Sequence, residues 1–427
     1  MTIPSHAGPG AWILRALSVS VLLLAAGCDD QTLVATAPEV EDDLFQRYVA
    51  MGNSITAGFQ SDGINRETQA ESYAVFVARQ MGTPFNQPLL NLPGCPAPLT
   101  NPLTGDRVGD ALPQGCALRS SPAPRVLNQV AVPGAAMLDL LSNLEPESNP
   151  NPLTTLVLGG RTQLEAALDA QPTFVSIWIG NNDVLGAAVS GMVTEDNVTP
   201  PQDFSTRLSQ SLNELENGGV AGGVLIGVAD VTLIPHLSSG AAYWVAAQGD
   251  ALPTTFQVAD SCAPSQFGGL GEETLVPFGY GFGELMGQAM EGRQVTLDCA
   301  QDLQVLSNQE IGELVSTVAA YNDILAQEAA SRGWAFFNPN PIFRELYDEG
   351  FIPPFPAVQI PSQLFGPVFS LDGVHPSGLG HRLVANGVME AINETYGTGL
   401  DPVDIPDPGV TAGSTSGAGL QTLAEGW

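Results

Sequence analysis

The sequence predicts an α/β domain in which helices cover both faces of a mainly parallel sheet. Short apolar runs, such as residues 173–179, alternate along the chain with longer segments whose apolar residues recur at helical spacing, such as residues 308–332. This alternation is typical of strands that are buried on both faces and joined by crossover helices. The chain has 427 residues, of which 44% are hydrophobic, so it can bury one large core or two ordinary ones.

The alternation begins with an apolar run at residues 47–52, which ends in a glycine turn and is expected to be the first strand. Residues 70–82 follow with apolar side chains at helical spacing. The remaining elements are expected as strands at 126–132, 173–179, 223–229 and 334–337, and as helices at 137–144, 204–215, 308–332 and 377–396. Together they predict a three-layer α/β/α body that extends from residue 46 to residue 396.

Two stretches do not follow this alternation and are expected to be insertions. Residues 91–124 are rich in proline, and residues 236–306 are rich in glycine and aromatic residues. A third stretch, residues 343–369, is apolar without being periodic, so it either lines a substrate cleft or packs on the core as a proline-rich loop. Residues 397–427 are rich in Gly, Ser, Thr and Pro, and we expect them to be disordered.

The N-terminal residues indicate export. Residues 1–27 combine a lone positive charge at Arg15 with an apolar run too short to span a bilayer, which is typical of a signal peptide. The run ends in Leu24-Ala25-Ala26-Gly27-Cys28, which resembles the lipobox of bacterial lipoproteins, although leucine is more usual at the second position. The resemblance implies a lipid on Cys28 that anchors the protein to a membrane of the cell envelope, followed by a flexible tether at residues 28–45. The alternative is ordinary secretory cleavage, which would leave Cys28 as a free thiol.

The other four cysteines form two local pairs, Cys95 with Cys116 and Cys262 with Cys299. In an oxidising compartment this spacing predicts two disulfides, each of which closes one of the insertions. The sequence contains no Cys-x-x-Cys, so neither a zinc ribbon nor a thioredoxin-like site is expected.

The chain is strongly acidic, with a formal charge of -32, and all 13 of its basic residues are arginine. Such a surface excludes nucleic-acid binding as the main function. This composition has two possible explanations. One is adaptation to high salt, in which the self-repulsion of the charges keeps the protein soluble. The other is a GC-rich codon bias, which would favour arginine over lysine. The sequence contains neither a His-Glu-x-x-His motif nor an acidic metal cluster, so we expect no metal and no cofactor.

Histidine is scarce, and one of the four histidines stands close to an aspartate. His375 follows Asp372 by three residues, in a loop directly before the last expected helix. This offset lets the carboxylate reach one ring nitrogen while the other nitrogen faces a cleft, as a catalytic base requires. An Asp and a His before a helix could instead form a surface cap.

Ser54 lies in Gly52-Asn53-Ser54-Ile55-Thr56, directly after the first expected strand. A residue between a strand and a helix lies at the carboxyl edge of the sheet, where open α/β folds bind ligands. The N-terminus of the following helix favours negative charge that develops there. A serine nucleophile would suit this position, although the commoner role of a serine there is to cap the helix.

Two further loops follow expected strands and could supply hydrogen-bond donors. Asn182 lies in Gly180-Asn181-Asn182-Asp183, where a side-chain amide can point into the cleft. Gly134 lies in Ala131-Val132-Pro133-Gly134-Ala135, where its backbone N–H is available to a ligand. Asn, Asp and Gly are also common in plain turns.

Taken in order, these four segments resemble the conserved blocks of the SGNH or GDSL family of hydrolases. The resemblance implies that Ser54 is the nucleophile, His375 the general base and Asp372 the carboxylate that orients it. It also implies that the oxyanion is stabilised by the backbone N–H groups of Ser54 and Gly134 and by the side chain of Asn182. Four short blocks in the right order, each beside an expected strand or helix, are specific where each alone is not.

The sequence departs from the family pattern at Asn53, where Asp is usual, and at Ile55, where Leu is usual. Neither change removes a catalytic atom. The resemblance implies a flavodoxin-like order of strands, and the sequence lacks the Gly-x-Ser-x-Gly elbow of the α/β-hydrolase fold.

The function that this resemblance implies is the hydrolysis of carboxylic esters. The apolar insertions and the lipid anchor favour lipid or acyl esters, as in a lipase or lysophospholipase. The alternative within the same family is the removal of O-acetyl groups from polysaccharides. A hypothesis of another class is a surface-anchored binding lipoprotein that keeps the fold without turnover.

Overall fold

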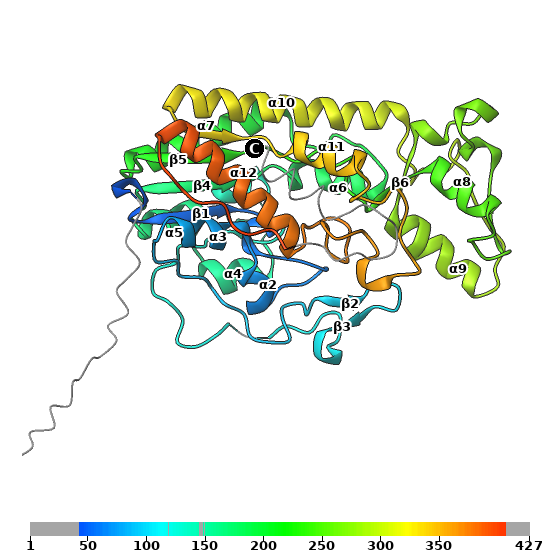
Figure 1. Ribbon diagram of the computed structural model, residues 1–427, viewed down its shortest axis with the longest axis horizontal. Helices are drawn as coiled ribbons and strands as arrows, with labels where there is room; N and C mark the ends of the chain where they lie inside the picture. The colour runs from blue at the N-terminus through cyan, green and yellow to red at the C-terminus, as the bar shows by residue number, and fades with distance from the viewer. Residues whose placement is uncertain (1–41, 118, 145–147, 149, 407–427) are drawn as a thin grey trace, which may run out of the picture. The chain divides into compact units, whose positions relative to one another are not determined.

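The centre of the computed structural model, which describes residues 42–117, 119–144, 148 and 150–406, is a parallel sheet. Its strands are β1 (Tyr48–Gly52), β4 (Phe174–Trp178), β5 (Gly222–Ile226) and β10 (Ala335–Phe337), in the order β1-β4-β5-β10 (Figure 1). β1, β4 and β5 are buried along their whole length. Burial on both faces explains why these segments are continuous apolar runs in the sequence.

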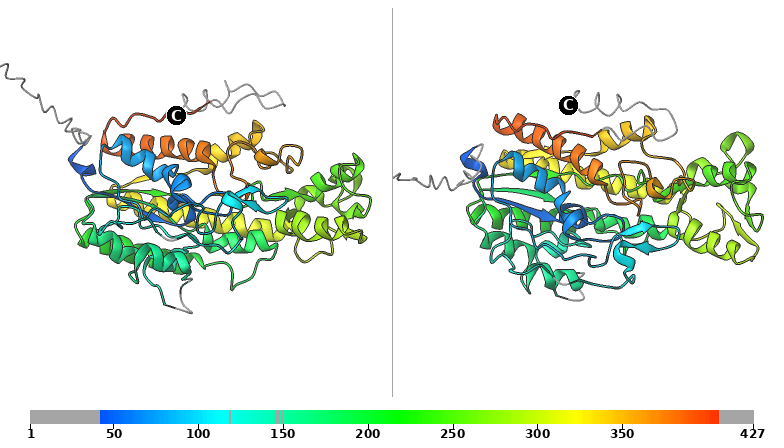
Figure 2. Two further views of the ribbon diagram at one scale, coloured as in Figure 1. Left: turned by 90° about the horizontal axis from the view of Figure 1, so that it is seen from below. Right: turned by 60° about the horizontal axis from the view of Figure 1, so that its bottom comes forward.

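Helices cover both faces of this sheet (Figure 2). One layer consists of α3 (Tyr73–Gln80) and α12 (Gly378–Tyr396), which contact each other, and α12 also packs on β10. The other layer consists of α5 (Gln163–Asp169), α7 (Pro201–Asn217) and α10 (Asn308–Arg332). The predicted α/β/α fold with a parallel sheet is therefore confirmed.

The segment expected to be a strand at residues 126–132 runs along the outer edge of β1 but is not a strand. Ala50 of β1 accepts a hydrogen bond from the Val130 N–H and donates one to the Asn128 carbonyl. The side-chain amide of Asn128 donates to the Tyr48 carbonyl at 2.8 Å, so a side chain takes the acceptor that a strand backbone would use. The segment still occupies the edge position beside β1, as a flavodoxin-like order requires.

The helix expected at residues 70–82 is α3, and a separate short helix, α2 (Arg66–Ala70), precedes it. The chain restarts because the hydroxyl of Ser72 accepts a hydrogen bond from the Ala74 N–H and caps α3. The helix expected at residues 137–144 is a 3-10 turn at Met137–Leu140. Helices of the body that the sequence did not predict include α5, α4 (Pro152–Leu158), α6 (Asn182–Ser190) and α11 (Asn340–Asp348).

The first insertion, residues 91–124, is closed by the Cys95–Cys116 disulfide and contains the short hairpin of β2 (Leu99–Asn101) and β3 (Asp106–Arg107). Among its described residues, the buried hydrophobic side chains are Cys95 and Ala97. This insertion therefore has no core of its own and rests on the body of the domain.

The second insertion, residues 236–306, has a small hydrophobic core that includes Tyr243, Phe256 and Val276. Its elements are β6 (Leu237–Ser239), α8 (Gly240–Gln248), β7 (Phe256–Val258), β8 (Leu275–Pro277), a π-helix (Gly279–Met286), α9 (Gly287–Met290) and β9 (Val295–Leu297). β6 pairs with β8 in antiparallel fashion, and β7 pairs with β9 in parallel fashion.

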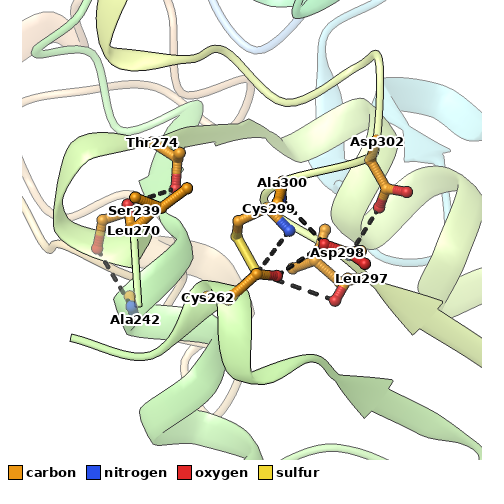
Figure 3. The surroundings of a disulfide bond; sticks show 11 residues. Ser239, Ala242, Cys262, Leu270, Thr274, Leu297, Asp298, Cys299, Ala300 and Asp302 are labelled. Carbon is orange, nitrogen blue, oxygen red and sulfur yellow. Dashed lines mark hydrogen bonds between the residues drawn. A yellow bond between two sulfur atoms is a disulfide. The ribbon is translucent and has the colours of Figure 1, made fainter. Parts of the chain in front are cut away.

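The Cys262–Cys299 disulfide closes this second insertion (Figure 3). The backbone N–H of Cys299 lies 3.1 Å from the sulfur of Cys262, and the N–H of Asp298 donates to Asp302 at 2.9 Å. Both cysteine pairs that the sequence predicts are thus joined in the structure.

The ends of the folded body differ from the expected boundaries. Phe45 is fully buried and its ring packs edge-on against Phe174, so the folded chain begins before residue 46. The expectation of disorder from residue 397 is wrong for residues 397–406, because Leu400 is buried and its N–H donates to the side chain of Asn393. The predicted signal peptide, the lipidation site Cys28 and residues 407–427 lie outside the described residues. No helix within the described part of the chain is long and apolar enough to cross a membrane.

Candidate active site

Ser54 lies at the point where β1 ends and the short helix α1 (Ser54–Ala57) begins. The turn requires glycine at position 52, because its φ is +144° and a Cβ atom there would lie 2.2 Å from the Trp178 carbonyl oxygen. The side chain of Gln163 accepts from the Gly52 N–H at 3.0 Å and donates to the Gly52 carbonyl at 2.9 Å. The Gln163 side chain therefore holds both the N–H and the carbonyl of Gly52, two residues before Ser54.

Asn53, not Ser54, caps α1. Its side-chain oxygen accepts a hydrogen bond from the Ile55 N–H at 3.0 Å. Asn53 thus performs the capping role for which an aspartate oxygen would also serve. Because the cap is already provided, the Ser54 hydroxyl is left for another partner.

That partner is His375, whose Nε2 lies 2.8 Å from the Ser54 Oγ. The other ring nitrogen of His375, Nδ1, lies 2.9 Å from Oδ2 of Asp372. Since the carboxylate can only accept, a neutral ring carries its hydrogen on Nδ1, and Nε2 is left to accept the hydroxyl proton of Ser54. The three side chains form one continuous chain of hydrogen bonds from a serine to a carboxylate.

The carboxylate of Asp372 is surrounded by donors. Its Oδ1 accepts from the backbone N–H groups of Val374 at 2.8 Å and His375 at 2.9 Å, and its Oδ2 accepts from the Asp62 N–H at 2.7 Å. Burial alone would raise the pKa of Asp372, but His375 and these hydrogen bonds hold that pKa well below its usual range. Asp372 is therefore an ionised carboxylate directed at His375, and the Asp372–His375 loop is more than a surface cap.

The Asp62 backbone that donates to Asp372 is held by the first insertion. Asp62 has a φ of +51°, a conformation that residues with a side chain rarely adopt. Arg107 of β3 places Nη2 2.5 Å from Oδ2 of Asp62 and Nη1 2.8 Å from its carbonyl oxygen. Arg107 also donates to the Ala97 carbonyl at 2.7 Å and is largely buried. Asp62 thus links the first insertion to the catalytic carboxylate, and the Leu99 N–H of β2 adds a second contact by donating to the Ser61 carbonyl at 2.7 Å.

The second insertion contacts the same loop through His236. The backbone N–H of His236 donates to the Gly373 carbonyl at 2.9 Å, and its ring Nδ1 lies 3.0 Å from the Asp372 carbonyl oxygen. Burial lowers the pKa of His236, which favours the neutral ring. Because a carbonyl oxygen only accepts, Nδ1 carries the hydrogen in this contact.

The three predicted oxyanion donors come from loops at one edge of the sheet. Asn182 begins α6, and its side-chain amide donates to the Ala135 carbonyl at 2.8 Å, which leaves its second amide hydrogen for a ligand. Gly134 has a φ of +84°, and neither its N–H nor that of Ser54 is paired with an acceptor in the described residues. Ser54 and Asn182 line the same small cavity.

Asp183 holds the glycine loop in place, a role that the sequence analysis missed. Its Oδ2 accepts from the Met137 N–H at 2.9 Å, two residues beyond the carbonyl that Asn182 contacts. Burial raises the pKa of Asp183 to about 6. The Asn-Asp pair therefore ties residues 133–137 to the start of α6.

A cavity of about 30 Å³ lies beside Ser54 and His375. Most of its other walls are apolar side chains, among them Leu185, Val231, Ile234, Phe343, Phe369 and Val374. The ring of Phe59 packs against the His375 ring at 4.9 Å between centroids. These surroundings suit a small uncharged group next to the serine hydroxyl.

The remaining described histidine, His381, belongs to the core. It is fully buried, its Nδ1 accepts from the Tyr73 N–H at 3.3 Å, and burial lowers its pKa to about 3. Within the described ranges, no cluster of three or more His, Cys, Asp or Glu side chains could hold a metal ion.

The structure brings Ser54, Asp372 and His375 together from the two ends of the chain, with Gly134 and Asn182 in neighbouring loops. The residues that sequence reasoning missed are Gln163, Asp62, Arg107, His236 and Asp183. Only Asp183 carried a local signal, because it stands next to Asn182. The others make contacts over 45 to 310 residues of sequence, which no local motif reveals.

Comparison with known proteins yields one family and distant structural likenesses. A model of the family described as GDSL-like lipase/acylhydrolase matches residues 48–388. An acetylxylan esterase from Geobacillus stearothermophilus is 13% identical, with 84% of this chain and 97% of that chain covered and a TM-score of 0.36. An extracellular lipase from Streptomyces rimosus is 15% identical, with 82% and 98% covered and a TM-score of 0.35. No match to a curated protein was found.

Proposed function

The chain belongs to the GDSL-like lipase/acylhydrolase family and is a carboxylic ester hydrolase, and we propose that it works through an acyl-enzyme on Ser54. The observation that supports this most directly is the unbroken series of hydrogen bonds from the Ser54 hydroxyl through His375 to Asp372. A non-catalytic binding protein would have no use for a serine whose hydroxyl is aimed at a histidine base.

In the first step, Ser54 Oγ attacks the carbonyl carbon of the ester while His375 Nε2 takes its proton. The ionised Asp372 stabilises the imidazolium that forms. The carbonyl oxygen becomes an oxyanion, and the N–H groups of Ser54 and Gly134 and the amide of Asn182 supply donors for it. When the intermediate collapses, the bond to the alcohol breaks, and His375 gives its proton to the departing alcohol oxygen.

In the second step, water replaces the alcohol. His375 removes a proton from the water as it attacks the acyl carbon, and the bond between Ser54 and the acyl group then breaks as the proton passes to Oγ. The products are a carboxylic acid and the free enzyme. No metal or cofactor takes part in this scheme.

The test is the hydrolysis of 4-nitrophenyl acetate by Ser54→Ala and His375→Ala. Each substitution should lower kcat by about a thousandfold or more while circular dichroism and Tm stay close to those of the wild type. Exposed Ser331, far along the chain on α10, gives a matched control as Ser331→Ala. Wild-type turnover by Ser54→Ala would refute the mechanism.

For the natural substrate, we propose lipid or acyl esters, as for a lipase or lysophospholipase. Support comes from the apolar walls beside Ser54 and from the aromatic and methionine side chains of the second insertion. An uncharged or apolar substrate also suits a chain of formal charge -32, because such a chain would repel anionic polymers.

The second candidate is the removal of O-acetyl groups from polysaccharides. The observation that favours it is the small size of the cavity at Ser54, about 30 Å³, which suits a small acyl group such as acetyl. The acyl-chain length profile separates the two candidates. Activity that rises from acetyl to octanoyl esters supports lipid or acyl esters as substrates, and activity confined to acetyl esters supports deacetylation of polysaccharides.

We also propose that the protein is exported and anchored to an envelope membrane by a lipid on Cys28. The two disulfides support export, because disulfides persist in oxidising compartments. Metabolic labelling with a radioactive fatty acid should mark the wild type but not Cys28→Ala, which should leave the membrane fraction. Equal labelling of the two proteins would refute the anchor.

A further inference from the structure

We infer that the second insertion forms a binding site for the hydrocarbon chain of the ester substrate, in a cleft separate from the small cavity at Ser54. This inference rests on the proposed function, because it names the substrate chemistry of the same enzyme. The cleft has a volume of about 1130 Å³, which exceeds the size typical of sites for drug-sized ligands.

The walls of this cleft come from all three segments that break the regular alternation of the fold. Leu103 is contributed by the first insertion, Val245 and Met290 by the second, and Phe355 by the apolar stretch 343–369. Both expectations for the stretch 343–369 apply to parts of it. Residues 364 and 365 pack in the core, while Pro354–Pro356 line the cleft.

The walls of the cleft include large hydrophobic side chains that are exposed to solvent. Val245 is 58% exposed and Met290 is 73% exposed, although both are large hydrophobic side chains. Exposed apolar side chains gathered around one concavity are typical of a surface that binds an apolar partner. Of the described residues that line the cleft, Glu272 carries the only charge, and its carboxylate already accepts from the Ser265 backbone and hydroxyl.

The floor of the cleft is a group of aromatic rings that leads toward the catalytic loop. Phe355 packs against Phe282 at 5.5 Å between ring centroids, Phe282 stacks on Phe278 at 5.1 Å, and Phe278 meets Phe365 edge-on at 5.1 Å. Phe365 lies against Gly373, where a Cβ atom would come within 2.9 Å of its ring.

Phe278 is also joined to the catalytic loop through the backbone. Its N–H donates to the His236 carbonyl at 2.7 Å, and the ring of His236 contacts the Asp372 carbonyl oxygen. One wall residue of the cleft is therefore a single residue away from the triad. This continuity favours the substrate's own chain as the occupant, because an unrelated ligand would not need a site next to the catalytic loop.

The site gives a role to the small cavity at Ser54 and to the apolar cleft alike. The small cavity beside Ser54 holds the reacting ester group, and the large apolar cleft holds an extended uncharged chain on one side of the ester bond. Burial of methylene groups supplies the affinity, since apolar burial needs no specific polar partner.

The test uses Ala242→Trp, which fills the cleft from α8, and Gln248→Trp as the matched control. Gln248 lies at the exposed end of the same helix and does not line the cleft. With 4-nitrophenyl octanoate, Ala242→Trp should lower kcat/KM by about tenfold or more, since it displaces several methylene groups of the chain. With 4-nitrophenyl acetate, both variants should match the wild type.

A binding measurement separates this inference from the proposed function. The Ser54→Ala protein is titrated calorimetrically with 2-decanone, an uncharged chain that cannot be hydrolysed, and should show saturable binding that the Ser54→Ala/Ala242→Trp double variant has lost. Equal affinity in the two proteins, or no binding to either, would overturn the inference. So would a loss of octanoate and acetate turnover by the same factor in Ala242→Trp. If Ser54→Ala still hydrolysed esters, the proposed acyl-enzyme mechanism would be refuted. The titration would still show whether the cleft binds the hydrocarbon chain.

Discussion

The two insertions use the same covalent device for different ends. Each is an irregular excursion closed by one disulfide, and each reaches the loop that carries Asp372. The first has almost no buried apolar residues and contacts the Asp62 turn through polar groups, among them the Arg107 guanidinium. The second has its own core and presents an apolar cleft.

The difference teaches what a local core makes possible. A segment without a core can contribute single polar contacts, because the body of the domain supplies the rigid support. A segment with a core can keep apolar side chains on its surface, because its fold does not depend on burying them. We therefore expect changes at Arg107 of the first insertion to affect all ester substrates equally, and changes at cleft-lining residues of the second insertion to affect long chains selectively.

The largest effect is expected at Asp372, whose backbone is contacted by His236 and whose carboxylate is linked to Arg107 through Asp62. Asp372→Asn removes the charge that stabilises the His375 imidazolium, so kcat should fall by about a thousandfold or more for acetyl and octanoyl esters alike. Asp401→Asn, at an exposed carboxylate of the C-terminal segment, is the control. A decrease of less than tenfold would contradict the assignment of Asp372.

Acid should also destabilise the protein through Asp372. Because its folded pKa lies below the unfolded value, its contribution to the free energy of unfolding is present above the ordinary aspartate pKa and is lost as the pH falls toward the folded pKa. Asp372→Asn should therefore show a weaker loss of stability than the wild type below about pH 4 in urea titrations.

Removal of each disulfide should distinguish the insertions next. The loop closed by Cys262 and Cys299 spans 37 residues and that closed by Cys95 and Cys116 spans 21, so loop entropy predicts losses of up to about 4 and about 3 kcal/mol. The double variant Cys262→Ala/Cys299→Ala should lose octanoyl activity selectively. The double variant Cys95→Ala/Cys116→Ala should lose acetyl and octanoyl activity together. The opposite pattern in the two kinetic assays would break the comparison.

Arg107→Ala should give a smaller, substrate-independent loss. Hydrogen bonds to charged groups contribute about 1.5–3 kcal/mol, so kcat should fall by roughly tenfold to a hundredfold for both esters. Arg125→Ala is the matched control, because Arg125 is an exposed arginine just beyond the same insertion. If Arg107→Ala changed only the KM for octanoate, Arg107 would belong to the chain-binding cleft and not to the support of Asp62.

The smallest effect concerns the body that supports both insertions. The pKa of Asp183 is raised to about 6 in the folded state, so its contribution to stability is fully present below the unfolded pKa and is lost as the pH rises through about 6. Between pH 7 and pH 5, the wild type should therefore gain about 1 kcal/mol relative to Asp183→Asn. Parallel stability curves for the two proteins, measured by urea denaturation, would contradict this role.

Much of the sheet could be predicted because its strands are buried on both faces. The expected segments 47–52, 173–179 and 308–332 agree with β1, β4 and α10, since continuous apolar runs and long amphipathic patterns are strong signals. The edge segment 126–132 could not be predicted correctly, because the Asn128 side chain replaces part of its backbone pairing.

The site was predictable only where function requires fixed residue types in a fixed order. Ser54, Gly134, Asn182, Asp372 and His375 each stand in a short block with a recognisable composition. Their support comes from Arg107, His236 and Gln163, whose partners are chosen by the tertiary fold. The composition of the two insertions indicated disulfides and apolar surface, but not the contacts that Arg107 and His236 make near the catalytic loop.

The most direct test of the account is to locate the covalent adduct of a fluorophosphonate probe by peptide mass spectrometry. We predict one adduct, on the peptide that contains Ser54, with labelling abolished in Ser54→Ala and slowed in His375→Ala and Asp372→Asn. An adduct on another residue, or unchanged labelling of Ser54→Ala, would contradict the central claim that Ser54 is the nucleophile.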